Sequence, residues 1–145
     1  MLRQASVGEL KKGEVSRERG YIVLAMRRYP RGVSKTLRDE YVAALGPPAE
    51  LLDELHALKK SHSHNDAFAA ARYEERFELT EPGIEALERL AELSRSRDVY
   101  LICQCKPDER CHRELLLLLA QARFRAQIAP LRFAYATYEA RVGKK

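Results

Sequence analysis

The chain has 145 residues, of which 46% are hydrophobic and 32% are charged. A chain of this length corresponds to one ordinary domain, and this hydrophobic content excludes an intrinsically disordered protein. The formal net charge of +5 permits a phosphate-bearing small molecule or a nucleic acid as a partner but requires neither. We therefore expect a single domain over residues 1–145 with its own hydrophobic core.

No segment of the sequence is typical of a membrane protein or a secreted protein. An apolar run such as residues 115–120 is far shorter than the about 20 residues that span a bilayer. The first residues, MLRQASVGELKKGE, lack the apolar core of a signal peptide. We therefore expect a cytoplasmic protein without a membrane partner, in which the three cysteines stay mostly reduced.

In the first half of the chain, the pattern predicts one strand and two helices. The first 20 residues are polar and interrupted by glycines, and no strand or helix is assigned to them. Residues 21–26 form a short apolar run between Gly20 and the sequence Arg-Arg-Tyr-Pro, which is typical of a buried strand. Helices are predicted over residues 36–45, which end at Gly-Pro-Pro, and over residues 48–60, whose leucines fall on one face.

The second half begins with the polar loop SHSHND, residues 61–66. Its two histidines and Asp66 could bind a metal, but a solvated loop is the simpler interpretation. Two helices are predicted next, one over residues 67–79 and one that begins after the cap residue Thr80. A strand over residues 99–105 and a helix over residues 108–127 follow. The chain then forms a short strand near residues 127–133, followed by irregular structure or helix.

Strands separated by helices indicate an α/β fold with a mostly parallel sheet flanked by helices. In such sheets, ligands bind beyond the carboxyl ends of the strands. Charged or reactive side chains gather at the carboxyl ends of two predicted strands. They belong to the arginine-rich loop 27–31 and to the segment 103–113, which holds all three cysteines. We therefore predict that Arg28 and the Cys-His-Arg sequence lie side by side at the carboxyl edge of the sheet.

The sequence CQCKPDERCHRE places Cys111 and His112 in or near the first turn of the predicted helix 108–127. A helix N-terminus carries partial positive charge and unpaired N–H groups, so it binds anions and lowers the pKa of a nearby thiol. We expect an anion site in which Cys111 is open to solvent, is the most reactive thiol, and acts as nucleophile or redox group. His112 would act as the acid or base. The alternative is that Cys111 turns inward against the sheet, because its spacing places it on the same helix face as Leu115 and Leu118.

Seven further residues complete the predicted site. Four arginines are expected to bind the anion, because guanidinium groups hold phosphate bidentately: Arg28, Arg31, Arg110 and Arg113. Cys103 and Cys105 share one face of the strand and would support the site, although each also suits a small buried hydrophobic position. Asp39 could act as an acid or base, although capping or pairing on a helix surface is the simpler role.

The segment 103–113 can be compared with two known kinds of cysteine site, a structural zinc site and a phosphatase-like loop. Cys103, Cys105, Cys111 and His112 could supply the Cys₃His set of a structural zinc site. The spacing lacks the usual pair of cysteines with two to four residues between them, and neighbours on an extended strand splay apart. The structural metal site therefore stays an alternative, and the leading prediction includes no metal and no other cofactor. A phosphatase-like loop is excluded, because neither Cys103 nor Cys105 is followed by an arginine six positions later.

A different surface gives another alternative, a non-catalytic nucleic-acid-binding module. Basic and aromatic side chains occur together near the C-terminus, where the candidate surface consists of Arg123, Arg125, Arg132, Phe124, Phe133 and Tyr135. Such a surface can hold phosphates and stack bases. The arginines could equally extend over packed aromatic rings towards solvent.

Four stretches of the chain, in order, resemble the DUF488 family of uncharacterised proteins. They are YIVLAMRRYPRGVSK, DEYVAALGPPAELL, ARYEERFEL and the strand that ends in a cysteine before Cys-His-Arg, and together they span about residues 20–122. Tyr29 and Tyr41 stand where that family's pattern usually has Trp, and Cys105 replaces an acidic residue. The resemblance implies an α/β fold, no established activity, and site residues at Arg28, Pro30, Arg31, Cys103, Cys111, His112 and Arg113.

The leading hypothesis is therefore a small α/β protein that binds a phosphate-bearing ligand such as a nucleotide or a nucleic-acid component. The sequence leaves open whether it is a thiol-dependent enzyme that acts on this ligand or only binds it.

Overall fold

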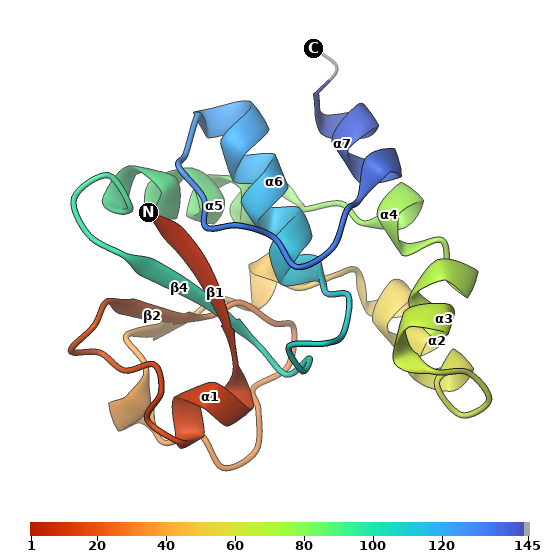
Figure 1. The fold of residues 1–145 in the computed structure, drawn as a ribbon, viewed down its shortest axis with the longest axis horizontal. Coiled ribbons are helices and arrows are strands. Elements are labelled where there is room, and N and C mark those ends of the chain that lie inside the picture. The colour runs from red at the N-terminus through yellow and green to blue at the C-terminus, as the bar shows by residue number, and fades with distance from the viewer. Residues whose placement is uncertain (144–145) are drawn as a thin grey trace.

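The computed structural model describes residues 1–143 and has a central sheet of four parallel strands (Figure 1). Strand β4 lies between β1 and β2, and β3 extends the sheet beyond β2. The predicted α/β class, with a parallel sheet flanked by helices, is confirmed. The strands are β1 (Leu2–Ser6), β2 (Tyr21–Leu24), β3 (Glu40–Tyr41) and β4 (Val99–Cys103).

Helices cover both faces of the sheet, and none of those within residues 1–143 combines the length and apolar character needed to cross a membrane. The α-helices are α1 (Val7–Lys11), α2 (Ala49–Leu58), α3 (His64–Ala70), α4 (Tyr73–Arg76), α5 (Glu81–Leu93), α6 (His112–Phe124) and α7 (Ala136–Val142). Two short 3₁₀ helices, η1 (Lys35–Leu37) and η2 (Ala43–Leu45), flank β3.

The sheet separates two apolar clusters, because successive residues of a strand point to opposite faces. Val23 and Leu101 belong to the larger cluster, which also contains residues of α5 and α6. Ile22 and Ile102 belong to the smaller cluster, with residues of α1. In Figure 1, α5 and α6 accordingly lie on one side of the sheet and α1 on the other.

The predicted central strand is confirmed, although β4 ends at Cys103 rather than at residue 105. It pairs with β1 so that Ser6 aligns with Cys103, and with β2 so that Leu24 aligns with Ile102. Because all these pairs are parallel, the carboxyl ends of β1, β2 and β4 meet at one edge of the sheet. The segments that follow β2 and β4 therefore start close together.

The first 20 residues, where no element was predicted, contain β1 and α1. Only Leu2, Ala5 and Ser6 of β1 are buried, so the strand has too few apolar residues to be recognised from its pattern. The start of α1 has a sequence signal that the pattern analysis missed. The Ser6 hydroxyl accepts a hydrogen bond from the Glu9 N–H at 3.1 Å, and the Glu9 carboxylate accepts one from the Ser6 N–H at 2.9 Å, which is a capping box.

The predicted helix over residues 36–45 is wrong, because this segment pairs with the edge of β2. The N–H of Asp39 donates to the Ile22 carbonyl at 2.8 Å, and the N–H of Val42 donates to the Leu24 carbonyl at 2.9 Å. A helix would have used these two backbone N–H groups for its own internal hydrogen bonds. Tertiary pairing therefore overrides the local helical pattern.

Two other predicted elements also differ from the structure. The helix expected over residues 67–79 is interrupted at Arg72, whose φ of 54° lies in the left-handed region, and it divides into α3 and α4. The strand expected over residues 127–133 is reduced to a single bridge between Ile128 and Leu2. The predicted helix 108–127 is confirmed over its central part but begins only at His112.

Glu40 joins β2, β3 and α5 through one carboxylate. It accepts a hydrogen bond from the Tyr21 hydroxyl at 2.5 Å and two from the Arg89 guanidinium, at 2.7 and 3.0 Å. The hydrogen bonds from Arg89 hold the pKa of Glu40 below its ordinary value. Burial, followed by the hydrogen bond to Glu40, raises the pKa of Tyr21 to about 12.

We predict that Glu40→Gln lowers the free energy of unfolding at pH 7 by about 1 kcal/mol. Because the pKa of Glu40 is lower in the folded state, its contribution is complete above the unfolded-state pKa of about 4.3 and is lost as the pH falls through the folded-state pKa. Urea denaturation at several pH values should show the difference from wild type shrinking towards acid. A difference that stays constant with pH would contradict this account. Glu88→Gln, at an exposed position of α5, is the matched control.

Candidate functional site

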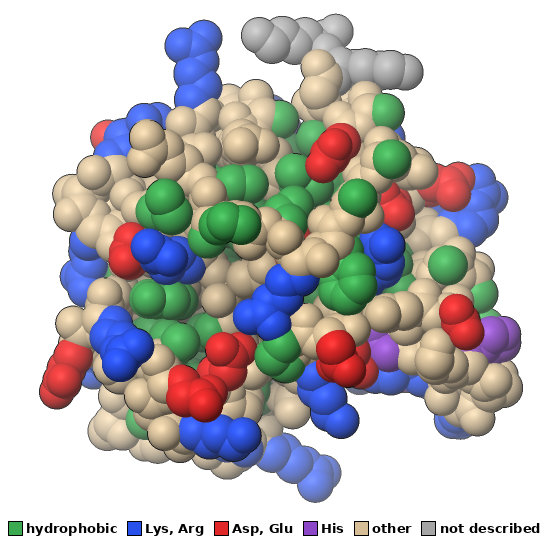
Figure 2. Space-filling model, in the orientation of Figure 1, with side chains coloured by type: hydrophobic (Ala, Val, Ile, Leu, Met, Phe, Trp, Pro, Cys, Tyr) green, Lys and Arg blue, Asp and Glu red, His purple; other side chains and the backbone are tan. Residues whose placement is uncertain are grey.

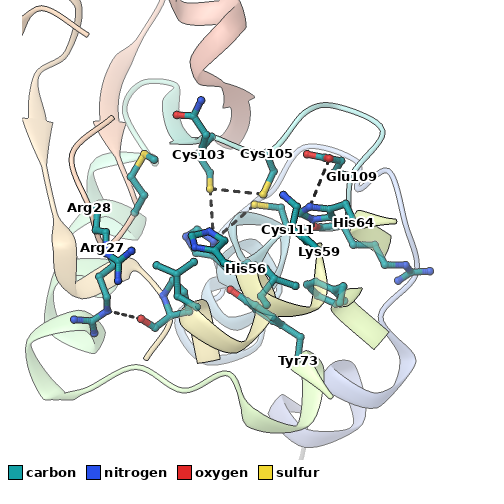
Figure 3. Close-up of a pocket in the computed structure, with 18 of the residues that line it drawn as sticks. Arg27, Arg28, His56, Lys59, His64, Tyr73, Cys103, Cys105, Glu109 and Cys111 are labelled. Atoms are coloured by element: carbon teal, nitrogen blue, oxygen red, sulfur yellow. Dashed lines mark hydrogen bonds and ion pairs between the residues drawn. The ribbon is translucent and has the colours of Figure 1, made fainter. Parts of the chain in front are cut away.

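A cavity of about 270 Å³ lies where the segments after β2 and β4 meet (Figure 3). Arg28 and its neighbours line it from one side, and the segment from Cys103 to Cys105 lines it from another. Cys111 and His112 also border the cavity. The structure thus brings the arginine loop and the Cys-His sequence together, as the sequence analysis predicted for two adjacent carboxyl strand ends.

The last residue of β4, Cys103, contacts His112 at the start of α6. The Cys103 Sγ lies 3.7 Å from His112 Nδ1, and the Cys111 Sγ lies at the same distance from that atom. The other ring nitrogen, Nε2, lies 2.6 Å from the carbonyl oxygen of Ala25. Since a carbonyl only accepts, Nε2 carries a proton and donates it, and this bond fixes the ring with Nδ1 facing the two sulfurs.

The three sulfurs and His112 shift one another's acidity. Hydrogen bonds from Cys105 and then Cys111 hold the pKa of the Cys103 thiol well below its ordinary value, against the opposing effect of burial. The hydrogen bond to Cys103 raises the pKa of Cys105 well above its ordinary value. Burial alone would lower the pKa of His112, but the charge on Cys103 and Cys111 raises it well above its ordinary value.

The prediction that Cys103 and Cys105 splay apart is wrong, because their Sγ atoms lie 4.0 Å apart. The reason is that β4 ends at Cys103, so Cys105 lies in a bend and its side chain turns back towards the strand end. Figure 3 shows the sulfurs of Cys103, Cys105 and Cys111 gathered at one end of the cavity.

Cys111 is the N-cap residue of α6, so the expected position near the first turn is confirmed. The expectation that its thiol is open to solvent is wrong, since Cys111 is only 1% exposed. It belongs to the smaller apolar cluster together with Ile102 and Cys103, and its N–H donates to the Tyr135 hydroxyl at 3.3 Å. The start of α6 is therefore packed against the sheet.

The four predicted anion-binding arginines divide into two groups. Arg28 and Arg110 line the cavity, where Arg28 also pairs with Asp53 and the Arg110 guanidinium lies over the rings of Phe133 and Tyr135. Arg31 is exposed and does not line the cavity. Arg113 is 1% exposed and does not line it either.

Arg113 and Glu114 instead hold the cavity wall together. The Arg113 guanidinium donates to the side-chain oxygen of Gln4 at 2.7 Å and to the Cys105 carbonyl at 2.8 Å. The Glu114 carboxylate accepts from the Gln4 amide at 2.7 Å and from the Tyr135 hydroxyl at 2.6 Å. These bonds connect α6 to β1 and to the loop that carries Cys105, so the expected anion-binding role of Arg113 is replaced by a scaffold role.

Asp39, the remaining predicted support, lies outside the cavity. Its carboxylate accepts from the Ile22 N–H at 2.7 Å and from Arg17 at 3.0 Å. It therefore stabilises the pairing of β2 with the following segment. The simpler interpretation of Asp39, as a pairing residue, agrees with these bonds, although the pairing is to a strand edge and not on a helix.

Several cavity residues were not part of the predicted site. Most of those that can carry charge are basic, and the acidic member of the set is Glu109: Arg27, His56, Lys59, His64 and Glu109. A run of apolar residues from α2 and α3 forms the opposite wall: Leu52, Leu55 and Phe68. The loop histidine His64 carried the nearest sequence signal, but only the fold brings it to this wall.

Among residues 1–143, two groups of side chains each have donor atoms close enough together to hold a metal ion. In the first, Cys103, Cys111 and His112 are all buried. The second consists of His64, Cys105 and Glu109. Within each group the donor atoms lie within 4.8 Å of one another.

The protein is thus an α/β protein with a parallel sheet and a cavity of cysteine and histidine side chains at the carboxyl edge of that sheet. The chain belongs to the DUF488 family: a family model named DUF488-N3a, described as the active DUF488-N3 subclade, matches residues 6–123. The match confirms the resemblance predicted over about residues 20–122 and extends it to α1. A search of curated proteins and a search of solved structures found no match.

We predict that Arg113→Met lowers the free energy of unfolding by about 3 kcal/mol, because buried carbonyl and amide oxygens lose their charged donor. For a chain of this size the melting temperature should fall by about 10 °C. Arg31→Met, at an exposed position outside the cavity, is the matched control and should change stability by less than about 0.5 kcal/mol. Thermal unfolding followed by circular dichroism measures both. An Arg113→Met protein with unchanged stability would contradict the scaffold role.

Proposed function

We propose that the protein is a thiol-dependent enzyme that acts on a small phosphate-bearing molecule, such as a nucleotide or another nucleic-acid component. Cys103 takes the role of nucleophile that the sequence analysis gave to Cys111. The observation that carries the proposal is the contact of the Cys103 Sγ with His112 Nδ1, at 3.7 Å, in a cavity whose charged side chains are mostly basic.

The reaction would be a transfer through a covalent intermediate. The Cys103 sulfur forms a bond to an electrophilic atom of the substrate, and the bond from that atom to the leaving group breaks. His112 donates the proton at Nδ1 to the leaving group. The hydrogen bond from His112 Nε2 to the Ala25 carbonyl keeps the ring in the orientation that this step requires.

Basic residues at the cavity would bind the anionic part of the substrate. Arg28, Lys59 and Arg110 line it, and guanidinium groups suit phosphate oxygens. The apolar wall formed by Leu52 and Phe68 would contact an uncharged part. A volume of about 270 Å³ suits a small ligand or one inserted group of a larger one, because typical small-molecule pockets begin at about 300 Å³.

The alternative of a non-catalytic nucleic-acid-binding module has less support. Tyr135, an aromatic residue of the predicted basic surface, is fully buried. On the face shown in Figure 2, basic and acidic side chains are interspersed and do not form one basic region. The three cysteines are free thiols, which are typical of the cytoplasm, and we therefore propose that the protein is cytoplasmic.

Alkylation of the metal-free protein tests the nucleophile. We expect iodoacetamide to label Cys103 at least about tenfold faster than Cys111, because hydrogen bonding by Cys105 lowers the pKa of the Cys103 thiol, and because Cys103 is 5% exposed whereas Cys111 is 1% exposed. His112→Gln should slow the labelling of Cys103, provided that circular dichroism shows the variant to be folded. Peptide mapping after short exposure identifies the labelled residue. Faster labelling of Cys111 would reject Cys103 as the nucleophile.

The charge of the reagent tests the anion site separately. We predict that negatively charged iodoacetate reacts with Cys103 faster, relative to neutral iodoacetamide, than it reacts with a small free thiol. The double variant Arg28→Gln, Lys59→Gln should lose most of this preference, whereas the matched control Lys60→Gln, at an exposed position outside the cavity, should keep it. An equal preference in all three proteins would contradict anion binding in the cavity.

A further inference from the structure

His64 is a buried histidine with one ring nitrogen that has no partner. Its side chain is 7% exposed, and its Nδ1 makes no hydrogen bond within residues 1–143. The other nitrogen, Nε2, lies 2.7 Å from the Arg110 carbonyl oxygen. Because a carbonyl only accepts, Nε2 holds a proton, and Nδ1 of the neutral ring presents a bare lone pair. Buried polar atoms without partners are rare and call for an explanation.

Two further donor atoms face this lone pair. The Glu109 Oε2 lies 3.5 Å from His64 Nδ1, and the Cys105 Sγ lies within 4.8 Å of both. The other Glu109 oxygen, Oε1, accepts from the Lys106 N–H at 2.8 Å, which fixes the carboxylate. Histidine ligands of metals characteristically donate their second N–H to a backbone carbonyl, as His64 does here.

We propose that His64, Cys105 and Glu109 bind a Zn²⁺ ion at the wall of the cavity. In a tetrahedral zinc site, bonds of about 2.0–2.3 Å separate the ligand atoms by about 3.3–3.8 Å. The observed separations, 3.5 Å for one pair and up to 4.8 Å for the others, require only small side-chain shifts. A thiolate, a carboxylate and a neutral imidazole balance the charge of a divalent cation.

The kind of metal follows from the donor atoms. Nitrogen, sulfur and oxygen together suit Zn²⁺, whereas Mg²⁺ and Ca²⁺ prefer oxygen ligands alone. The site is also held in place before any ion binds. Asn65 accepts a hydrogen bond from the Arg110 N–H at 2.8 Å and donates to the Asp108 carbonyl at 3.3 Å, so the start of α3 is attached to the loop that carries Glu109.

With three protein ligands, a tetrahedral ion keeps one open position, as in catalytic zinc sites. His64, Cys105 and Glu109 all line the cavity, so this position can receive a ligand from it. Cys103 lies 4.0 Å from Cys105, and an oxygen of an anionic substrate on the ion would lie near the proposed nucleophile. This role towards the substrate rests on the proposed function, whereas the binding of zinc itself does not.

Zinc titration of the purified protein tests the site. After removal of metal with a chelator, Zn²⁺ affinity is measured by competition with a chromophoric chelator. We expect one ion per chain, and affinity at least about tenfold weaker in His64→Gln and in Glu109→Gln. His62→Gln, two residues away and outside the cavity, is the matched control and should bind as wild type does.

Cobalt provides a second readout. Co²⁺ bound to the wild-type protein should show a thiolate charge-transfer band that Cys105→Ser removes and Cys111→Ser keeps. The proposal is overturned if the protein binds no Zn²⁺, or if binding survives His64→Gln and is lost in Cys111→Ser, which would place the ion on Cys103, Cys111 and His112. Alkylation of Cys103 is measured on metal-free protein, so failure of the zinc site and failure of the proposed nucleophile are distinguished.

Discussion

Strand β4 must lie inside the sheet, because it is apolar on both faces and needs a hydrogen-bonded partner on each edge. Its pairing with β1 and β2 aligns Cys103 with Ser6 and Ile102 with Leu24. Parallel pairing then places the segments after β2 and β4 at one edge, where open α/β sheets bind their ligands. The cavity, its sulfurs and its basic residues all follow from this one arrangement.

Local pattern was enough to predict β2, β4 and α6, whose ends border the cavity. The runs that became β2 and β4 were short and apolar, and the Cys-His sequence marked the start of α6. The pattern failed where distant contacts decide the structure. Residues 36–45 have a helical sequence but pair with the open edge of β2, and β1 has too few apolar residues to be recognised without its partner β4.

The candidate site, like the fold, was predictable where local sequence decides a residue's position and not where distant contacts decide it. A charged residue beside a thiol suggested a ligand contact at Arg113, but the burial of Arg113 depends on Gln4 and on the carbonyl of Cys105, which the sequence does not place nearby. The burial of Cys111 had a local signal in its helical spacing from Leu115 and Leu118. His64 had none of comparable strength, since its partner Arg110 is 46 residues away. Buried bonds thus hold the wall rigid, while Arg28 and Lys59 at the cavity remain exposed to solvent and to a ligand.

The structure of the protein after reaction with iodoacetate would test the central claim most directly, because the reagent reports both the reacting sulfur and the position of a negative charge. The account predicts a carboxymethyl group on the Cys103 Sγ, with its carboxylate directed towards Arg28, Lys59 or Arg110. An adduct on Cys111, or a carboxylate on Cys103 turned away from all three basic side chains, would contradict it.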